Sequence, residues 1–260
     1  MRLITDTRVK HSKYMKLSKK IVSVLLTFTI ALGSFSVFSI FKNSSSKGSS
    51  SNRNDGIDFS GLTMACLGDS ITMANEDDNG KPYSYFVKNK LGLSQVYNYG
   101  IGWSTIGYME NCSCHEDDPT YDHNPFVYRY EKMLQADIIA VKGGLNDASV
   151  GMPIGTINDQ EPTTFYGALN ILADGLKKTY PNSYIFFMTP FKYENNPTLL
   201  SYSNAIKEVC EKYDIDCLDI YTRLPFDRTQ HTTDGVHPKE EFIEELFAPL
   251  IVSFIKHNYE

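Results

Sequence analysis

The sequence has no cluster of basic residues after its first twenty positions, and its 260 residues carry a formal net charge of -6. Proteins that bind nucleic acids need a basic surface for the phosphates, so this composition argues against a nucleic-acid partner. Cysteine is also scarce, with five residues in the chain. An odd number leaves at least one thiol unpaired, so no disulfide framework is expected, although Cys210 and Cys217 could pair if their helix and strand touch.

The chain also lacks internal repeats of fixed period and any standard zinc-binding spacing. One short insertion is rich in possible metal ligands, namely Cys112, Cys114, His115, Asp117, Asp118, Asp122 and His123. A solvated acidic loop explains this insertion better than a metal site does. We therefore expect no metal in this insertion.

An uncharged, mostly apolar run occupies residues 21–41. A helix of this length, at about 1.5 Å per residue, reaches across the roughly 30 Å of a bilayer core. The preceding residues 1–20 contain seven lysine and arginine residues, which favours a cytoplasmic amino end. We therefore expect a transmembrane helix in the cell membrane, with the rest of the chain extracellular.

The triplet Ala31-Leu32-Gly33 suggests an alternative, because small residues two apart can mark a signal-peptidase site. The apolar run continues beyond this triplet, so we favour a retained anchor over a cleaved signal peptide, which would give a secreted protein. Residues 42–56 are rich in serine, asparagine and glycine and are typical of a flexible linker. Residues 57–260 are expected to form one folded domain.

Strand-like apolar runs alternate with helical apolar spacing throughout this domain. The expected strands are residues 63–68, 95–99, 137–142, 184–188 and 216–221, and the expected helices are 83–91, 127–134, 163 or 164 to 180, 197 or 198 to 213, and 238–257. Residues 143–162 are expected to form a loop. Parallel neighbours need crossover connections, so the alternation predicts a three-layer α/β/α fold with a parallel five-stranded sheet.

Glycine and polar residues gather where these strands end. The segments are Gly68-Asp69-Ser70 after the first strand, Asn98-Tyr99-Gly100-Ile101-Gly102 after the second, Gly143-Gly144-Leu145-Asn146-Asp147 after the third, and Asp234-Gly235-Val236-His237 after the fifth. Ligands bind at the carboxyl ends of the strands in open α/β sheets. We therefore expect the chemistry in these four segments.

Ser70 follows a buried strand in a tight turn, which suits a nucleophile, although a plain capped turn would read the same way. His237 is the candidate base, because an imidazole can take the serine proton near neutral pH. Pro238 is expected to open the last helix and hold His237 just before it. Asp234 can accept a hydrogen bond from the other ring nitrogen of His237. His231 is a rival base, but no aspartate stands three residues before it.

Attack on an ester carbonyl creates an oxyanion that needs hydrogen-bond donors. The side-chain amide of Asn146 and the backbone N–H groups of Ser70 and of Gly102 or Trp103 are the expected oxyanion hole. Trp103 and Asp69 are the candidate substrate-binding residues.

These four segments, in this order, resemble the sequence blocks of the SGNH hydrolases, the family of GDSL esterases and lipases. Ser70 matches the family's nucleophile, Asn146 matches the asparagine of its Gly-x-Asn-Asp block, and Asp234 and His237 match its Asp-x-x-His block. The second block departs from the family pattern, which often has glycine where Trp103 stands. The resemblance covers residues 64 to 260.

The resemblance implies a flavodoxin-like sheet with strand order 2-1-3-4-5 and ester hydrolysis through an acyl-enzyme, without a metal or any other cofactor. We expect an extracellular serine esterase that removes a short acyl group, such as acetyl, from a carbohydrate. The expected export and the aromatic second block favour this substrate. A lipase or lysophospholipase acting near the bilayer is one alternative. A surface binding module that keeps the fold without turnover is another.

Overall fold

The computed structural model describes residues 56–74, 80–109, 125–194 and 196–259. The basic segment, the apolar run at 21–41, all but the last residue of the expected linker, and the cysteine- and histidine-containing insertion lie outside these ranges. Within them, no helix has the length and apolarity to cross a bilayer, and no three histidine, cysteine, aspartate or glutamate side chains are grouped as metal ligands.

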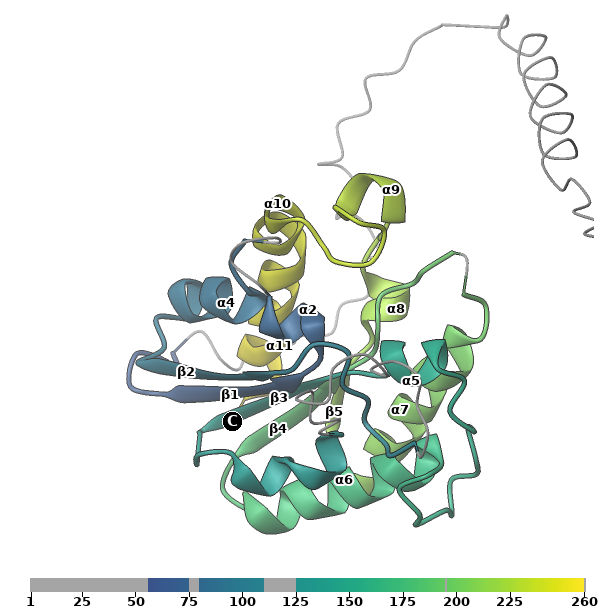
Figure 1. Ribbon diagram of the computed structural model, residues 1–260. Coiled ribbons are helices and arrows are strands. Elements are labelled where there is room, and N and C mark those ends of the chain that lie inside the picture. Colours follow the sequence, from purple (N-terminus) through teal and green to yellow (C-terminus); the bar gives the residue numbers. More distant parts are fainter. Residues whose placement is uncertain (1–55, 75–79, 110–124, 195, 260) are drawn as a thin grey trace, which may run out of the picture. The chain divides into compact units, whose positions relative to one another are not determined.

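Five parallel strands form one sheet in the order β2-β1-β3-β4-β5, as predicted (Figure 1). They are β1 (Thr63–Gly68), β2 (Gln95–Gly100), β3 (Ile138–Lys142), β4 (Tyr184–Met188) and β5 (Asp216–Leu218). β5 is shorter than expected. Asp219 caps a short helix, α8 (Ile220–Arg223), immediately after it.

Helices cover both faces of the sheet. Figure 1 shows α4 (Tyr83–Leu91) and α11 (Ala248–Asn258) on one face and α6 (Phe165–Thr179) and α7 (Leu199–Tyr213) on the other. Residues along each strand alternate between the two layers, so Met64 and Cys66 of β1 join the first apolar cluster, while Ala65 and Leu67 join the second. The predicted three-layer α/β/α fold is therefore confirmed.

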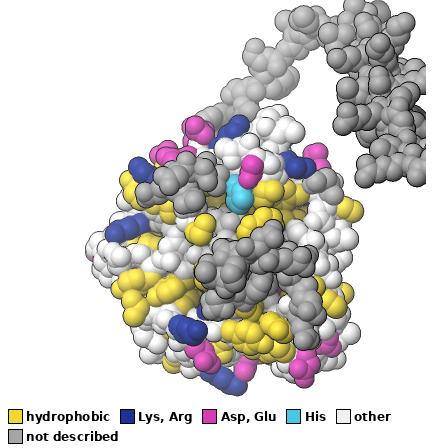
Figure 2. Space-filling view, in the orientation of Figure 1, with side chains coloured by type: hydrophobic (Ala, Val, Ile, Leu, Met, Phe, Trp, Pro, Cys, Tyr) yellow, Lys and Arg dark blue, Asp and Glu magenta, His cyan; other side chains and the backbone are white. Residues whose placement is uncertain are grey.

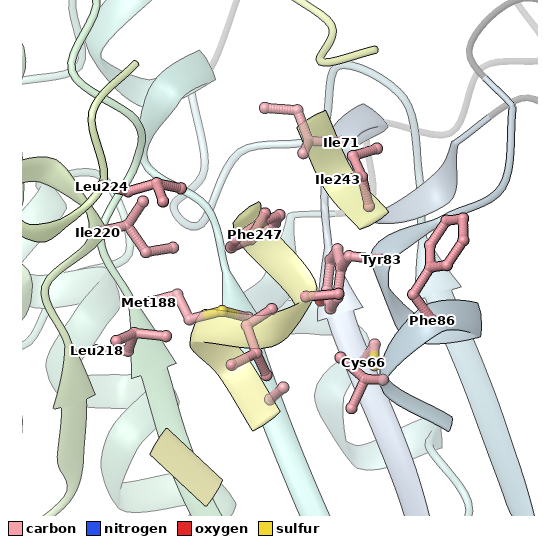
Figure 3. Packing of buried hydrophobic residues seen from close by; sticks show 14 of the residues in the cluster. Cys66, Ile71, Tyr83, Phe86, Met188, Leu218, Ile220, Leu224, Ile243 and Phe247 are labelled. Carbon is pink, nitrogen blue, oxygen red and sulfur yellow. The ribbon is translucent and has the colours of Figure 1, made fainter. Parts of the chain in front are cut away.

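The first cluster extends to the edge of the sheet where β1 ends. The rings of Tyr83 and Phe247 pack with centroids 5.2 Å apart, and Cys66 points into the same layer (Figure 3). Ile71, only 3% exposed, lies beside Ile243 in this cluster. Burial of Ile71 ties the turn that carries Ser70 to the core.

The prediction of a helix at 127–134 is wrong. The chain forms two single turns of 3-10 helix there, η3 (Phe126–Tyr128) and η4 (Tyr130–Lys132). The backbone N–H groups of Phe126 and Val127 donate to Thr105 and Ile106, and Arg129 has a φ of -130° between the turns. Tertiary hydrogen bonds thus outweigh the helical preference of the segment.

The last helix begins two residues later than expected. It starts at α10 (Glu240–Phe242) and continues through a π-helical turn, η5 (Ile243–Phe247), into α11. Pro238 instead faces Thr232 in an antiparallel bridge, whose hydrogen bonds come from the neighbouring N–H groups of Thr233 and Lys239. Proline suits this bridge position, because no N–H is required of it.

Short helices lie in segments that were expected as loops or turns. They are α2 (Ser70–Met73), α5 (Leu145–Ser149) and α9 (Arg228–His231). At this length the apolar spacing carries no helical signal. Cys210 and Cys217, the pair that could have bridged, are both free thiols.

Candidate active site

The turn after β1 places Ser70 at the carboxyl edge of the sheet. Asp69 is the N-cap of α2, and its Oδ1 accepts a hydrogen bond of 2.9 Å from the N–H of Ile71. A Cβ on Gly68 would lie 1.8 Å from Oγ1 of Thr72, so only glycine allows this close approach. Ser70 is therefore the first residue of α2, as the tight turn predicted.

Ser70, His237 and Asp234 lie in one hydrogen-bonded chain. Nε2 of His237 is 2.9 Å from Oγ of Ser70, and Nδ1 is 2.6 Å from Oδ2 of Asp234. Figure 2 shows a histidine at the surface beside an acidic side chain, with hydrophobic side chains around them. The structure thus brings together residues 167 positions apart in the sequence in the arrangement that activates a serine.

The carboxylate of Asp234 is held by its own loop. Oδ1 accepts from the N–H groups of Val236 and His237, at 2.8 Å each. Partial burial acts to raise the pKa of Asp234, but these hydrogen bonds and that with the His237 ring outweigh it and lower the pKa to about 2. Asp234 is therefore ionised wherever a neutral imidazole can act as a base.

The loop that contains His237 is closed by three side chains. Nε of Arg228 donates to the carbonyl of Gly235 (2.6 Å), and the hydroxyl of Tyr193 donates to the carbonyl of Val236 (2.6 Å). Oγ1 of Thr232 accepts from the N–H of Gly235 (2.8 Å). These contacts orient the histidine without the helix start that the sequence predicted.

Asn146 lies on α5 at the end of β3 and is 7% exposed. Its Nδ2 donates one hydrogen bond of 2.9 Å to the carbonyl of Ser104, and an amide nitrogen carries a second hydrogen. The loop that contains Ser104 is joined to the end of β1, since the N–H of Ile101 donates to Gly68 (3.1 Å). The second and third blocks therefore meet beside the nucleophile turn.

Trp103 adopts a φ of +60° and is 58% exposed, whereas Gly102 before it is buried. The left-handed region costs a residue with a Cβ about 1–2 kcal/mol. This conformation explains why the family often has glycine at this column. The tryptophan keeps the backbone geometry of a glycine and adds a large exposed ring.

Asp147 anchors the loop that follows Trp103. Its side chain is fully buried and accepts from the N–H groups of Ile106 (2.9 Å) and Gly107 (3.1 Å). Burial raises the pKa of Asp147 to about 7, although these hydrogen bonds act in the opposite direction. The carboxyl therefore holds its proton in the folded protein at pH values where the unfolded chain has lost it.

This raised pKa predicts a pH-dependent stability. Between pH 4 and 7 the folded state binds more protons at Asp147 than the unfolded state, so stability falls as pH rises, by at most about 1.4 kcal/mol per pH unit. In Asp147→Asn this contribution disappears, because the amide does not titrate. Denaturant melts at several pH values measure the slope, and an unchanged slope in Asp147→Asn would contradict the assignment.

Arg129 is a site residue that sequence reasoning missed. It is 7% exposed, and its NH2 donates to the carbonyl of Gly68 (2.6 Å) and to Oγ of Ser104 (3.1 Å), while NH1 donates to the carbonyl of Tyr99. The guanidinium lies 4.7 Å from the ring centre of Phe126. Arg129 thus fastens the ends of β1 and β2 to the second block. An arginine within the expected helix at 127–134 gives no sign of this.

Two expectations for this region are corrected. Asp69 was expected to bind substrate, but its side chain is 1% exposed and serves as the cap of α2. His231 was considered as a rival base, but its Nδ1 accepts from the N–H of Asp227 (2.9 Å) and its ring stacks on Phe242 at 4.6 Å. His231 is therefore a structural residue.

The family model described as GDSL-like Lipase/Acylhydrolase matches residues 84–233, which is more than half of the chain. The match includes Asn146 and ends just before Asp234, so it contains neither the nucleophile turn nor the histidine block. No curated protein sequence matches the chain.

Solved structures share the fold. A Lactobacillus plantarum protein is 25% identical, with a TM-score of 0.67, over 77% of this chain and 99% of that one. A possible lipase from Chitinophaga pinensis is 19% identical (TM-score 0.60; coverage 75% and 98%). An acetylxylan esterase from Geobacillus stearothermophilus is 18% identical (TM-score 0.54; coverage 78% and 98%). The latter two show similarity of fold alone.

The order of the four blocks and the family match over residues 84–233 agree with each other and with the sheet order. They confirm the resemblance drawn from the sequence. The chain belongs to the GDSL-like lipase/acylhydrolase family, the SGNH hydrolases, and is a serine hydrolase that acts on ester bonds.

Proposed function

We propose that this hydrolase removes short acyl groups, such as acetyl, from a carbohydrate, with Ser70 as the nucleophile. The observation that carries the mechanism is the hydrogen-bonded chain from Ser70 through His237 to Asp234, with distances of 2.9 and 2.6 Å. A serine hydroxyl becomes a competent nucleophile only when a base takes its proton. His237 is that base, and Asp234 fixes its tautomer and stabilises the imidazolium.

The reaction has two halves. Oγ of Ser70 attacks the carbonyl carbon while its proton moves to Nε2 of His237, and the tetrahedral intermediate places negative charge on the carbonyl oxygen. The N–H of Ser70, the amide of Asn146 and the N–H of Gly102 or Trp103 stabilise that charge. Collapse expels the alcohol, which takes the proton from Nε2. A water then repeats the attack on the acyl-enzyme and releases the acid.

Exposed aromatic side chains support a carbohydrate as the leaving group. Trp103 is 58% exposed, Tyr128 is 51% exposed, and the ring of Tyr128 lies 5.8 Å from that of Tyr108. Aromatic faces stack on the apolar faces of sugar rings, so such rings suit a sugar ester. The acetylxylan esterase of the same fold acts on a substrate of this class.

The substrate is tested by comparing acyl lengths. We expect p-nitrophenyl acetate to be hydrolysed with a higher kcat/KM than p-nitrophenyl decanoate, and acetylated xylo-oligosaccharides to release acetate. Faster turnover of the decanoate would favour the lipase or lysophospholipase alternative.

Trp103→Gly separates the ring from the backbone donor. Glycine adopts a φ of +60° without strain and keeps the backbone N–H, so kcat on p-nitrophenyl acetate should be unchanged. Loss of the stacking ring should raise KM for the acetylated oligosaccharide about three- to tenfold, since such contacts are worth about 0.5–1.5 kcal/mol. An unchanged KM would exclude Trp103 from the sugar site.

Asn146→Ala should lower kcat about 10²- to 10³-fold with little change in KM, because an oxyanion donor acts mainly in the transition state. Asn170 is the matched control, since it is fully buried and its Nδ2 donates to the carbonyls of Ile157 and Asp159. Asn170→Ala should reduce thermal stability and leave kcat unchanged. Equal losses of kcat in both variants would contradict the role of Asn146.

For location, we propose a single-pass membrane protein with the hydrolase domain outside the cell, or a secreted protein if the segment is cleaved. The basic residues 1–20 and the apolar run at 21–41 support this topology. If the protein is anchored, protease added to intact cells that express the full chain should remove the esterase activity from the cell surface. If the segment is cleaved, the activity should be found in the medium. Activity that is protected until the cells are lysed would contradict this topology.

A further inference from the structure

Two oppositely charged side chains are buried under the nucleophile turn. Lys142 is the last residue of β3 and has no exposed surface, and Asp69 is 1% exposed. Gly68, which precedes Asp69, is the register partner of Lys142 across β1 and β3. Within the described residues, the buried side-chain nitrogen and oxygen atoms that lack a hydrogen-bond partner are Nζ of Lys142 and Oδ2 of Asp69.

A buried ion without compensation is costly, so the ionised form of each side chain is favoured by the charge of the other. Burial raises the pKa of Asp69, and the ammonium of Lys142 is the leading influence in the opposite direction. Burial lowers the pKa of Lys142, and the carboxylate of Asp69 opposes that shift. Nζ of Lys142 also lies 4.6 Å from the ring centre of Phe191, which is a favourable contact for a cation.

Other titratable groups interact electrostatically with Asp69, and they come from several elements. They are Arg129 between η3 and η4, His237 on the carboxyl-terminal loop, Asp147 on α5, Tyr83 on α4 and Tyr193 after β4. The guanidinium of Arg129 is already bonded to the carbonyls of Gly68 and Tyr99. The ammonium of Lys142, in contrast, makes no hydrogen bond to any residue that the structure describes.

We propose that Lys142 is a positioning residue of the hydrolase, which acts by neutralising the buried carboxylate of Asp69 beneath Ser70. Asp69 caps α2 through the N–H of Ile71 and so orients the N–H of Ser70, a donor of the oxyanion hole. An uncompensated carboxylate at this place opposes the negative charge that develops on the substrate. The proposal rests on the function proposed above, because it assigns a role within the same site.

The test is a double-mutant cycle. Lys142→Met fills a similar volume without charge, and Asp69→Asn keeps the capping oxygen without charge. Lys142→Met alone should lower kcat on p-nitrophenyl acetate about tenfold or more. In the Asp69→Asn background the same change should lower kcat less than about twofold, because no carboxylate remains to be neutralised. Active-site titration corrects each rate for the fraction of competent enzyme.

The pH profile separates this role from a merely structural one. In Lys142→Met the loss of kcat relative to the wild type should shrink as pH falls, because protonation of Asp69 removes the charge that opposes the oxyanion. In the double variant Lys142→Met with Asp69→Asn this dependence of the loss on pH should be absent. A residue needed only for packing would change the amount of active enzyme and leave the shape of the profile as in the wild type.

Lys207 and Asp219 form the matched control pair, with Nζ and Oδ2 3.2 Å apart and both side chains partly exposed. Lys207→Met and Asp219→Asn should leave kcat and the pH profile unchanged. The proposal is overturned if Lys142→Met costs kcat equally in both backgrounds or if its loss of kcat is the same at every pH. If Lys142→Met does not fold, recovery of a cooperative thermal transition in the double variant supports the coupling. A double variant that also fails to fold overturns the proposal. Fluorophosphonate labelling of the wild type, lost in Ser70→Ala, tests the proposed function separately.

Discussion

Ser70→Ala is expected to lower kcat for p-nitrophenyl acetate by about 10⁴- to 10⁶-fold, because no other group can form the acyl-enzyme. Oγ of Ser70 is the atom that accepts the acyl group and gives its proton to Nε2 of His237, 2.9 Å away. A fluorophosphonate probe reacts with the same activated oxygen. Labelling and steady-state rates should therefore disappear together in this variant.

Ser203→Ala is the matched control for the nucleophile. Ser203 is fully buried in α7, and its hydroxyl donates to the carbonyl of Leu199 (2.9 Å). Its loss should reduce stability by about 1 kcal/mol and leave labelling intact. A wild type that the probe does not label at micromolar concentration would favour the binding module that keeps the fold without turnover.

His237→Ala should lower kcat by about 10⁴-fold, since removal of a triad member leaves only the oxyanion hole and substrate binding. The pKa of Asp234 is lowered to about 2, so at neutral pH its carboxylate is ionised and faces Nδ1 of His237 at 2.6 Å. The loss of kcat in His237→Ala is measured per folded molecule with p-nitrophenyl acetate. A His237→Ala variant that keeps most of the wild-type kcat would contradict this assignment.

His231→Ala is the natural control for His237→Ala, because the rival histidine lies six residues earlier. Its ring packs on Phe242 and its Nδ1 accepts from Asp227. The substitution should therefore lower the melting temperature and leave kcat per folded molecule unchanged. A loss of kcat comparable to that in His237→Ala would contradict the structural role.

The strands and their order could be predicted because their signals are local. Apolar runs such as Ile138–Lys142 suit strands that are covered on both faces, and β3 lies at the centre of the sheet. The site could be located for a related reason. Ser70, Asn146 and His237 each follow a strand or its loop, and the carboxyl ends of parallel strands share one edge.

The residues that were missed depend on contacts distant in sequence. Arg129 is a site residue only because the carbonyls of Gly68 and Tyr99 point at it, and no nearby residue reports that. Lys142 ends an apolar run, where a lysine is usually expected to reach solvent. Pro238 was placed at a helix start by its general preference, but the bridge to Thr232 decides its position.

The bridge between Thr232 and Pro238 has a consequence for heat inactivation. The catalytic histidine stands on a loop that few backbone hydrogen bonds close, whereas Ser70 begins α2 directly after β1, which is paired with strands on both sides. Local opening is easiest where such bonds are few. Warming should therefore release the imidazole first, so that esterase activity is lost reversibly, below the temperature at which circular dichroism reports melting. Coincidence of the two transitions would show that the loop and the sheet unfold as one unit.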